Sequence, residues 1–565
     1  MSRGYLPYLI IVAIGLVIFL PFIGVSHLFD WDEINFAESA REMLVTGNFA
    51  QVTVNFEPFW EKPPLFIWVQ ALSMSVFGVG EFAARLPNVL IMIATLCTVF
   101  YIGRKHYTDQ LALLWVLFFA GSITPHLYAH SGIIDPLFNL FIFLSVYQLY
   151  LSTIRNDYLP WVLSGLFLGL AVLTKGPAAG LIVGLCGLVI WVYRGFKFWF
   201  SLPKALSWFF TMVVVASLWF LPELLKNGPG FLESFIIYQL QLLTSPVASH
   251  GQPWFYHFLV LAVGCVPASL VMLPTLYNRI KGNDEFLRLM KILFWVVLIL
   301  FSLVTTKIVH YSSLCYLPIA FLAAHSVINS RAKRFVSGAL IFVGVLWAII
   351  LILIPMIGYW NDSFLQSYGH LIQDEFTRAN LAVDGGWKWF HFIPGVLILL
   401  SFLWLRSGWA EMQRKRIIQA LVMFTISLSL LFAIIVPPVE KHLQHSVIEF
   451  YETIQNEDCY VDVYGYKSYA HYFYARIKPL KESDQLFSKR NEFLDERMAQ
   501  RTIDLPESTR KEVDDDIMNW MKYGNIDKPV YLVCQQKKIA ELKALNSFEM
   551  VFERGGFAAF RRMPQ

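Results

Sequence analysis

Carboxylate side chains lie at places in this 565-residue chain where they could do chemistry. Asp32 and Glu33 directly follow the first apolar run, and Asp135 lies in the segment Ser-Gly-Ile-Ile-Asp-Pro at the start of a later one. A carboxylate held at such a point can act as a general base or can orient an attacking hydroxyl. From its spacing alone, Asp32 is equally well explained as the N-cap of a helix, because aspartate is a preferred capping residue.

Basic side chains occur at similar places. Lys62 lies in Phe-Trp-Glu-Lys-Pro-Pro, where the prolines stiffen the backbone, and Lys175 lies in Leu-Thr-Lys-Gly-Pro. The segment Thr-Lys-Ile-Val-His-Tyr contains Lys307, His310 and Tyr311. Cations of this kind can bind a phosphate and stabilise the charge that develops on it. The alternative for Lys62 is a lysine whose ammonium only extends to the membrane interface.

A membrane would have to position these residues. The chain is 56% hydrophobic and 15% charged, whereas soluble proteins contain about 25% charged residues. Runs of about 20 apolar residues can cross a bilayer, and by this criterion the chain has about 13. They begin near Leu6, Ala84, Leu111, Ile133, Leu159, Pro177, Leu206, Trp254, Lys291, Tyr311, Phe335, Trp389 and Ile417. The sequence therefore predicts a polytopic α-helical membrane protein, and the first run, which has no small-x-small cleavage site, is predicted to be a retained span.

Loops rich in basic residues alternate with loops that have few. The basic loops are those near Arg104, Arg155, Arg194, Arg279, Arg331 and Arg414. Because basic loops stay in the cytoplasm, the N-terminus is predicted to be cytoplasmic and the C-terminal segment external. All the candidate residues above then lie on the outer face of the membrane.

The first external loop, residues 27–83, is predicted to contain an amphipathic juxtamembrane helix. Ile34, Ala37, Ala40 and Leu44 share one helical face, and Glu38 and Arg41 have the spacing of an ion pair on the other. Such a helix is expected to lie on the membrane surface.

The chain becomes polar from about Pro437. Strand-like runs alternate there with helical stretches, which predicts two domains: residues 1–437 in the membrane and a small external α/β domain at 438–565. The strand-like runs are Cys459 to Tyr464, Val530 to Cys534 and Phe557 to Arg561. Cys459 and Cys534 could pair if this part is exported, and two separate thiols are the alternative.

The combination of these motifs resembles one enzyme family. The Asp-Glu pair after the first run, Ala-Arg-Glu-Met-Leu, Glu-Lys-Pro-Pro-Leu, Asp135-Pro, Thr-Lys-Gly-Pro and Lys307 to Tyr311 resemble the ArnT-like branch of the C-type glycosyltransferases. This branch includes the bacterial lipid A aminoarabinose transferases and, more distantly, the protein O-mannosyltransferases. The resemblance covers about Asp30 to Pro318, and the layout of 13 spans with an external tail is similar to that of the aminoarabinose transferases.

The resemblance implies an inner-membrane enzyme that moves a sugar from a polyprenyl-phosphate donor, such as undecaprenyl phosphate, to an acceptor on the outer face. The acceptor class stays open between lipid A, another glycolipid, a polysaccharide and a protein. Asp32 matches the family's catalytic aspartate, and Glu33 and Asp135 are the further candidate carboxylates. Displacement in one step would invert the anomeric centre.

The resemblance also implies which residues bind phosphate and metal. Lys62 matches a residue that grips the carrier phosphate, Tyr311 matches a tyrosine near it, and Glu61 and His250 match positions that can hold zinc. The family often has arginine where this chain has Asn35, and no arginine lies between Pro222 and Pro253. The phosphate ligands are therefore expected among Lys62, Lys175, Lys307 and His310.

Two other function classes are alternatives to the enzyme. A transporter or flippase for lipid-linked glycans would place its charges near the membrane midplane, whereas these candidates lie at the outer ends of the runs. A membrane scaffold whose external domain binds cell-wall components would leave the segment from Asp32 to Lys62 unexplained. The net charge of +4 and the absence of a basic stripe argue against nucleic acid as a partner.

Overall fold

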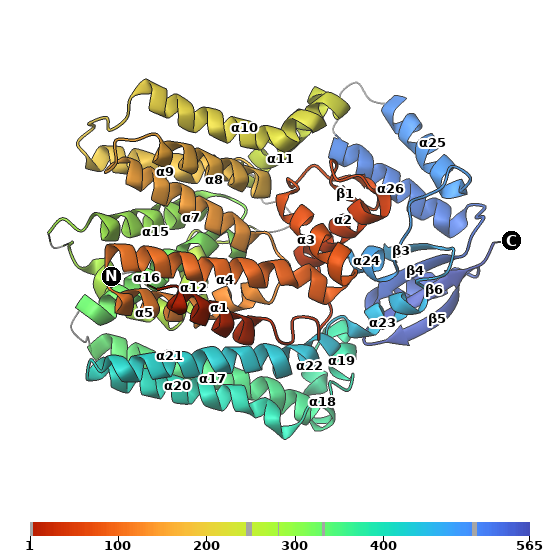
Figure 1. Cartoon of the computed structure of the whole chain (residues 1–565). Helices are drawn as coiled ribbons and strands as arrows, with labels where there is room; N and C mark the ends of the chain where they lie inside the picture. Colours follow the sequence, from red (N-terminus) through yellow and green to blue (C-terminus); the bar gives the residue numbers. More distant parts are fainter. Residues whose placement is uncertain (1–3, 245–250, 281, 330–333, 500–505, 565) are drawn as a thin grey trace.

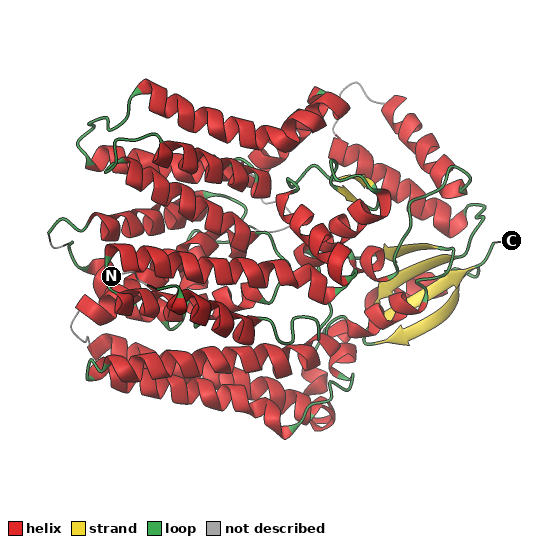
Figure 2. Cartoon of the chain, viewed as in Figure 1, coloured by secondary structure: helices red, strands yellow, loops and turns green. Residues whose placement is uncertain are grey.

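The computed structural model describes residues 4–244, 251–280, 282–329, 334–499 and 506–564. Long helices lie side by side in a bundle, and a smaller part that contains a β-sheet covers one end of it (Figure 1 and Figure 2). Residues 27–83, which are predicted to be external and keep the name first external loop below, lie at the same end of the bundle as the sheet (Figure 1).

Each predicted apolar run begins within a few residues of the start of a helix. The first runs form α1 (Leu6–Phe19), α4 (Glu81–His106), α5 (Asp109–Ala120) with α6 (Ile123–Ala129), α7 (Asp135–Ser152), α8 (Leu159–Lys175), α9 (Ala178–Tyr193) and α10 (Leu202–Asn227). The later runs form α12 (Tyr256–Gly264) with α13 (Ala268–Val271) and α14 (Leu273–Tyr277), α15 (Glu285–Leu303), η2 (Val309–Cys315) with α16 (Tyr316–Asn329), α17 (Arg334–Tyr359), η4 (Trp389–Phe392) with α20 (Ile393–Ala410), and α21 (Arg414–Leu430) with η5 (Leu431–Ile435) and α22 (Val436–Lys441).

Not all of these helices are long enough to span a bilayer as straight rods. In the described part of the chain, seven helices have the length and composition of a span, or up to nine if each bent pair counts as one. The α5–α6 pair bends by 74°, and α12 bends by 106° against the α13–α14 segment, just before which Pro267 interrupts the helix. The expected number of about 13 spans thus remains a prediction.

The first external loop folds into α2 (Asp32–Thr46), β1 (Thr53–Val54), β2 (Glu57–Pro58) and α3 (Leu65–Phe77). The predicted ion pair is confirmed, because Arg41 Nη2 lies 2.6 Å from Glu38 Oε1. The expected position on the membrane surface remains a prediction, but neither face of the helix is exposed, since every residue of α2 from Glu33 to Met43 is buried. The polar face is covered by the C-terminal segment, where the Ile477 carbonyl accepts a hydrogen bond of 2.8 Å from Arg41 Nη2.

Two segments expected to be loops contain helices. The segment between Pro222 and Pro253 contains α11 (Pro229–Thr244), and that between Gly358 and Lys388 contains α18 (Asn361–Tyr368), η3 (Gly369–Leu371) and α19 (Glu375–Leu381). α11 is held by aromatic packing, because the Trp219 ring of α10 lies 5.2 Å from Phe231 and 6.4 Å from Phe235. The two phenylalanines of α11 are thus buried against α10.

The C-terminal segment combines helices with a four-stranded sheet. Its strands β3 (Tyr460–Tyr464), β4 (Val530–Gln535), β5 (Glu549–Arg554) and β6 (Phe557–Arg562) have the order β3-β4-β6-β5, and only β3 and β4 are parallel. Its helices are α23 (His445–Thr453), α24 (Ala470–Tyr474), α25 (Gln485–Ala499), α26 (Pro506–Tyr523), η6 (Gln536–Lys538) and α27 (Ile539–Lys543). The three predicted strands are present, the exposed edge strand β5 was not predicted, and Cys459 and Cys534 are separate thiols.

The first external loop and the C-terminal segment share one hydrophobic core. Buried residues of the loop, including Leu28, Ile34 and Ala37, belong to the same cluster as Val447, Ile448, Tyr451, Phe473 and Tyr474. The Tyr474 hydroxyl also accepts a hydrogen bond of 2.7 Å from the backbone N–H of Leu28. The predicted boundary near residue 437 therefore separates an apolar part of the sequence from a polar part, but side chains from both parts pack together in one core.

Candidate active site

Asp32 is the first residue of α2, and the N-cap is Trp31. Its side chain is exposed, and among the described residues it makes no hydrogen bond or ion pair. Its charge acts on the hydroxyls of Tyr238 and Tyr311, which places all three side chains near one another. The geometry therefore gives no support to the capping interpretation and leaves a free carboxylate at the start of α2.

Glu33, the next residue, is buried and fully engaged. Its Oε1 accepts hydrogen bonds from Arg85 Nε at 2.7 Å and from the Gly132 backbone N–H at 2.6 Å. Its Oε2 accepts from Arg85 Nη2 at 3.0 Å and from the Phe29 backbone N–H at 2.8 Å. Arg85 also donates to three backbone carbonyls in the segment that follows α1. This network fixes the start of α2 against α4 and the turn before α7, and it thereby positions Asp32.

Asp135 and Lys175 form an ion pair between the start of α7 and the end of α8. Lys175 Nζ lies 2.5 Å from Asp135 Oδ1, and the carboxylate side is nearly fully buried. The same ammonium lies 5.5 Å from the centre of the Tyr311 ring. The charge of Lys175 is thus already compensated in this structure, and Asp135 holds it beside Tyr311.

Lys62 and Glu61 meet at Tyr238, a residue of α11. The Lys62 ammonium lies 5.7 Å from the centre of the Tyr238 ring, and among the described residues it has no ion-pair partner. The Tyr238 hydroxyl is hydrogen-bonded to Glu61, and its pKa is raised by burial first and by the charge of Glu61 second. The sequence analysis missed Tyr238 because its segment was interpreted as a loop. The four-residue spacing of Phe231 and Phe235 was the available signal of a helix.

Lys307 lies just before η2, and His310 lies within it. Lys307 is buried, and its ammonium donates a hydrogen bond of 2.7 Å to the Val304 carbonyl. His310 Nδ1 lies 2.7 Å from the Tyr128 hydroxyl. His250 lies outside the described residues, so its predicted pairing with Glu61 at a metal remains a prediction.

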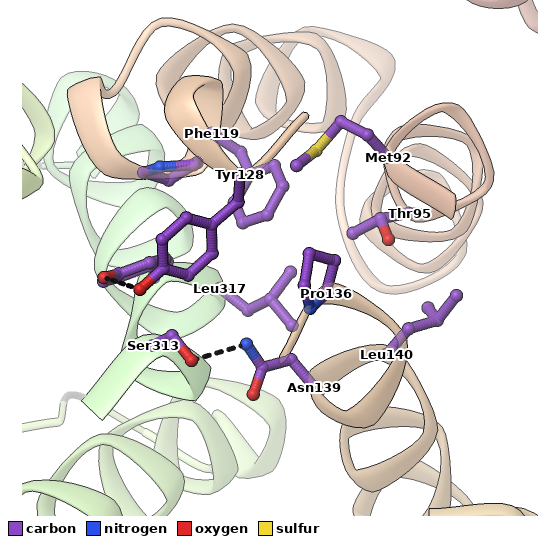
Figure 3. Close-up of a pocket in the computed structure, with 11 residues that line it drawn as sticks. Met92, Thr95, Phe119, Tyr128, Pro136, Asn139, Leu140, Ser313 and Leu317 are labelled. Atoms are coloured by element: carbon purple, nitrogen blue, oxygen red, sulfur yellow. Dashed lines mark hydrogen bonds between the residues drawn. The ribbon is translucent and has the colours of Figure 1, made fainter. Parts of the chain in front are cut away.

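A small cavity is lined by residues of α4, α5, α6, α7, η2 and α16 (Figure 3). Its volume is about 20 Å³, which is room for about one water molecule and too little for a sugar or a lipid. Figure 3 shows Asn139 directed at Ser313, and Asn139 Nδ2 donates to Ser313 Oγ at 2.8 Å. This contact joins η2, which carries His310 and Tyr311, to α7, which begins with Asp135.

Comparisons with known proteins agree with this arrangement. Residues 61–224 match the family described as dolichyl-phosphate-mannose-protein mannosyltransferase. The chain is 31% identical over 307 residues to an uncharacterised protein of Aquifex aeolicus, and this alignment spans 54% of the chain and 70% of that protein. It is 28% identical over 349 residues to the undecaprenyl phosphate-alpha-4-amino-4-deoxy-L-arabinose arabinosyl transferase 1 of Pseudomonas fluorescens. The chain belongs to the ArnT-like glycosyltransferase superfamily.

The ArnT-like fold extends over the whole chain. The crystal structure of ArnT from Cupriavidus metallidurans bound to undecaprenyl phosphate matches with a TM-score of 0.74 and 19% identity, and it covers 100% of both chains. The sequence alignment with the Pseudomonas fluorescens enzyme is shorter and spans 59% of this chain and 61% of that enzyme. Sequence likeness is thus concentrated in one part of the chain, whereas the ArnT-like architecture is shared throughout.

Proposed function

We propose that this protein transfers a sugar from a polyprenyl-phosphate donor to an acceptor at the end of the bundle that carries the C-terminal segment. One observation carries the proposal: the Asp32 carboxylate and the Lys62 ammonium, both without an ion-pair partner among the described residues, lie near the same tyrosine, Tyr238. The names of the relatives support the same donor class, since one is an undecaprenyl phosphate aminoarabinose transferase and one structure is of ArnT bound to undecaprenyl phosphate.

The proposed reaction is a single displacement. The acceptor oxygen forms a bond to the anomeric carbon while the bond from that carbon to the phosphate oxygen breaks, so the configuration is inverted. The proton of the acceptor hydroxyl passes to Asp32, which acts as the base. The electron pair of the broken bond stays on the departing polyprenyl phosphate, and Lys62 stabilises that negative charge.

The other candidate residues have supporting roles in this proposal. Glu33 is a positioning residue, because its two oxygens are already occupied by four donors. Asp135 holds Lys175 beside Tyr311. In this proposal the Lys175 ammonium exchanges Asp135 for the carrier phosphate when the donor binds. Lys307 and His310 complete the set of groups proposed to bind the carrier phosphate.

Zinc is a proposed cofactor of this site. Glu61 fits the requirement, because a carboxylate that is only partly buried and bonded to one phenol keeps lone pairs for a metal. Glu61 and His250 would hold the ion, and the ion would add positive charge beside the departing phosphate. Two protein ligands leave the remaining positions for substrate or water.

The proposed location is the bacterial inner membrane, with the N-terminus in the cytoplasm and the active site on the outer face. The alternation of basic loops supports this orientation. The acceptor is proposed to be a hydroxyl or phosphate of lipid A, another glycolipid, a polysaccharide or a protein. The mass of the product identifies both the acceptor and the sugar.

Mass spectrometry of lipid, glycan and glycoprotein fractions tests the proposal. Cells that lack the protein are complemented with the wild type, with Asp32→Asn, or with Asp362→Asn, a matched control in the exposed first turn of α18. We expect a glycosylated product with the wild type and the control, and its loss with Asp32→Asn at equal protein level. Equal product with Asp32→Asn would refute the catalytic role of Asp32, and the same products with and without the protein would refute the transfer itself.

A further inference from the structure

Three side chains from opposite ends of the sequence meet where the first external loop touches the C-terminal segment. His27 follows α1, Glu440 lies in α22, and His445 begins α23. His27 Nδ1 lies 2.9 Å from Glu440 Oε1, and His445 Nδ1 lies 3.3 Å from Glu440 Oε2. The two Nδ1 atoms lie 3.2 Å from each other. Each residue thus offers one nitrogen or oxygen atom to a common centre.

These separations match those between ligands of one metal ion. Zinc binds histidine nitrogen and carboxylate oxygen at about 2.0 to 2.2 Å in a tetrahedral arrangement, so its ligand atoms lie about 3.4 Å apart. One carboxylate and two imidazoles form a ligand set that zinc uses, with a fourth position left for water. The distances of 2.9, 3.3 and 3.2 Å are therefore close to those of a complete set of protein ligands.

The surroundings of the cluster suit a bound ion as well. The Glu440 side chain is only 3% exposed, while those of His27 and His445 are 16% and 23% exposed. The other ring nitrogen of His445, Nε2, lies 3.1 Å from Glu449 Oε1. A carboxylate that accepts the second N–H of a histidine fixes the tautomer in which the first nitrogen can bind a metal. The contact between His445 and Glu449 plays no part in bringing His27, Glu440 and His445 together, so it is independent support for a metal site.

We propose that His27, Glu440 and His445 bind a divalent transition metal of the zinc class, and that this ion joins the first external loop to the C-terminal segment. The proposed metal site lies beside the segment that leads into α2, because Gln444 Nε2 also donates a hydrogen bond of 2.7 Å to the Leu28 carbonyl. Its ligands are other residues than Glu61 and His250, and the proposal does not depend on the proposed sugar transfer. Its role is structural: the ion stabilises the packing that covers α2.

Metal binding to the purified full-length protein tests the site. The protein is freed of metal in detergent and titrated with Zn²⁺, and with Co²⁺ followed by its visible absorption. The titration is made in the Glu61→Gln background, so that the candidate metal position of the active site does not contribute. We expect about one equivalent of tightly bound ion and a higher melting temperature with Zn²⁺.

Variants of the cluster and a matched control identify the ligands. Adding His445→Ala or Glu440→Gln is expected to remove the bound equivalent, and adding Glu449→Gln is expected to weaken the affinity about 10- to 100-fold. His370→Ala, which removes an exposed histidine outside the cluster, is expected to change nothing. Absence of tight binding by the Glu61→Gln protein would overturn the proposal even if a cluster variant failed to fold. Equal stoichiometry and affinity in Glu61→Gln and in its folded His445→Ala derivative would overturn it too.

Discussion

Glu33→Gln separates the position of a carboxylate from its chemistry. In the structure each Glu33 oxygen accepts two hydrogen bonds, from Arg85 and from the backbone N–H groups of Phe29 and Gly132. Glutamine keeps one of these oxygens and replaces the other by an amide nitrogen that can only donate. This nitrogen then faces two other donors, and the Arg85 guanidinium loses its buried counter-ion.

The magnitude follows from burial. Glu33 is 4% exposed and Arg85 is 2% exposed, so water does not compensate for the lost carboxylate. Removing one partner of a buried ion pair typically costs about 3 to 5 kcal/mol of unfolding free energy. Asp32→Asn, which changes an exposed neighbour that has no ion-pair partner among the described residues, is expected to change stability by less than about 0.5 kcal/mol.

Reversible unfolding in mixed detergent micelles measures both variants under the same conditions. We expect Glu33→Gln to unfold at a clearly lower denaturant fraction and Asp32→Asn to unfold with the wild type. A double-mutant cycle with Arg85→Gln is expected to give a coupling of about 0.5 to 3 kcal/mol, the range for residues in contact. Wild-type stability in Glu33→Gln would refute the positioning role, and additive effects in the cycle would refute the pairing.

Three further predictions concern binding, pH and topology. Lys62→Gln is expected to weaken binding of undecaprenyl phosphate about 10- to 100-fold, since a charge-assisted hydrogen bond contributes about 1.5 to 3 kcal/mol. Both Lys62→Gln and the exposed control Lys226→Gln are titrated with this lipid, and equal dissociation constants for the two variants would contradict the prediction. Burial, and then the charge of Glu38, raise the pKa of Glu42 from its usual 4.5 to about 8, so the folded state favours the protonated form and stability is expected to fall as pH rises from 4.5 to 8. Glu42→Gln is expected to flatten that fall in pH-dependent melting curves, and an unchanged slope would contradict the raised pKa. A reporter that works only outside the cytoplasm, fused after Gln565, is expected to be active; a stable but silent fusion would refute the odd number of spans.

Local patterns predicted much of the fold. The apolar runs predicted the positions of the long helices, since length and composition alone distinguish a membrane span. Short apolar runs in the polar C-terminal segment predicted β3, β4 and β6. The strand β5 was missed because its apolar run, Met550 to Phe552, is short and is flanked by charged residues, and α11 was missed because the segment was interpreted as a loop between spans.

The contacts between distant segments could not be predicted in this way. The motifs identified Glu33 and Lys175 as candidates, but only the folded chain pairs them with Arg85 and Asp135. Arg85 had a usable signal, because an arginine at the start of an apolar run needs a buried partner. His27 and Glu440 had none, since 413 positions separate them along the chain.

The shared core between the first external loop and the C-terminal segment sets an order of events during biosynthesis. Leu28, Ile34 and Ala37 are made early, whereas Phe473 and Tyr474, which complete their cluster, are made only after all the apolar runs. Until then α2 lacks the part of its cover that the C-terminal segment supplies, so the nascent enzyme is exposed to chaperones and proteases. A copy that terminates before α23 is therefore expected to be degraded, so that only a completely synthesised chain acquires an ordered Asp32.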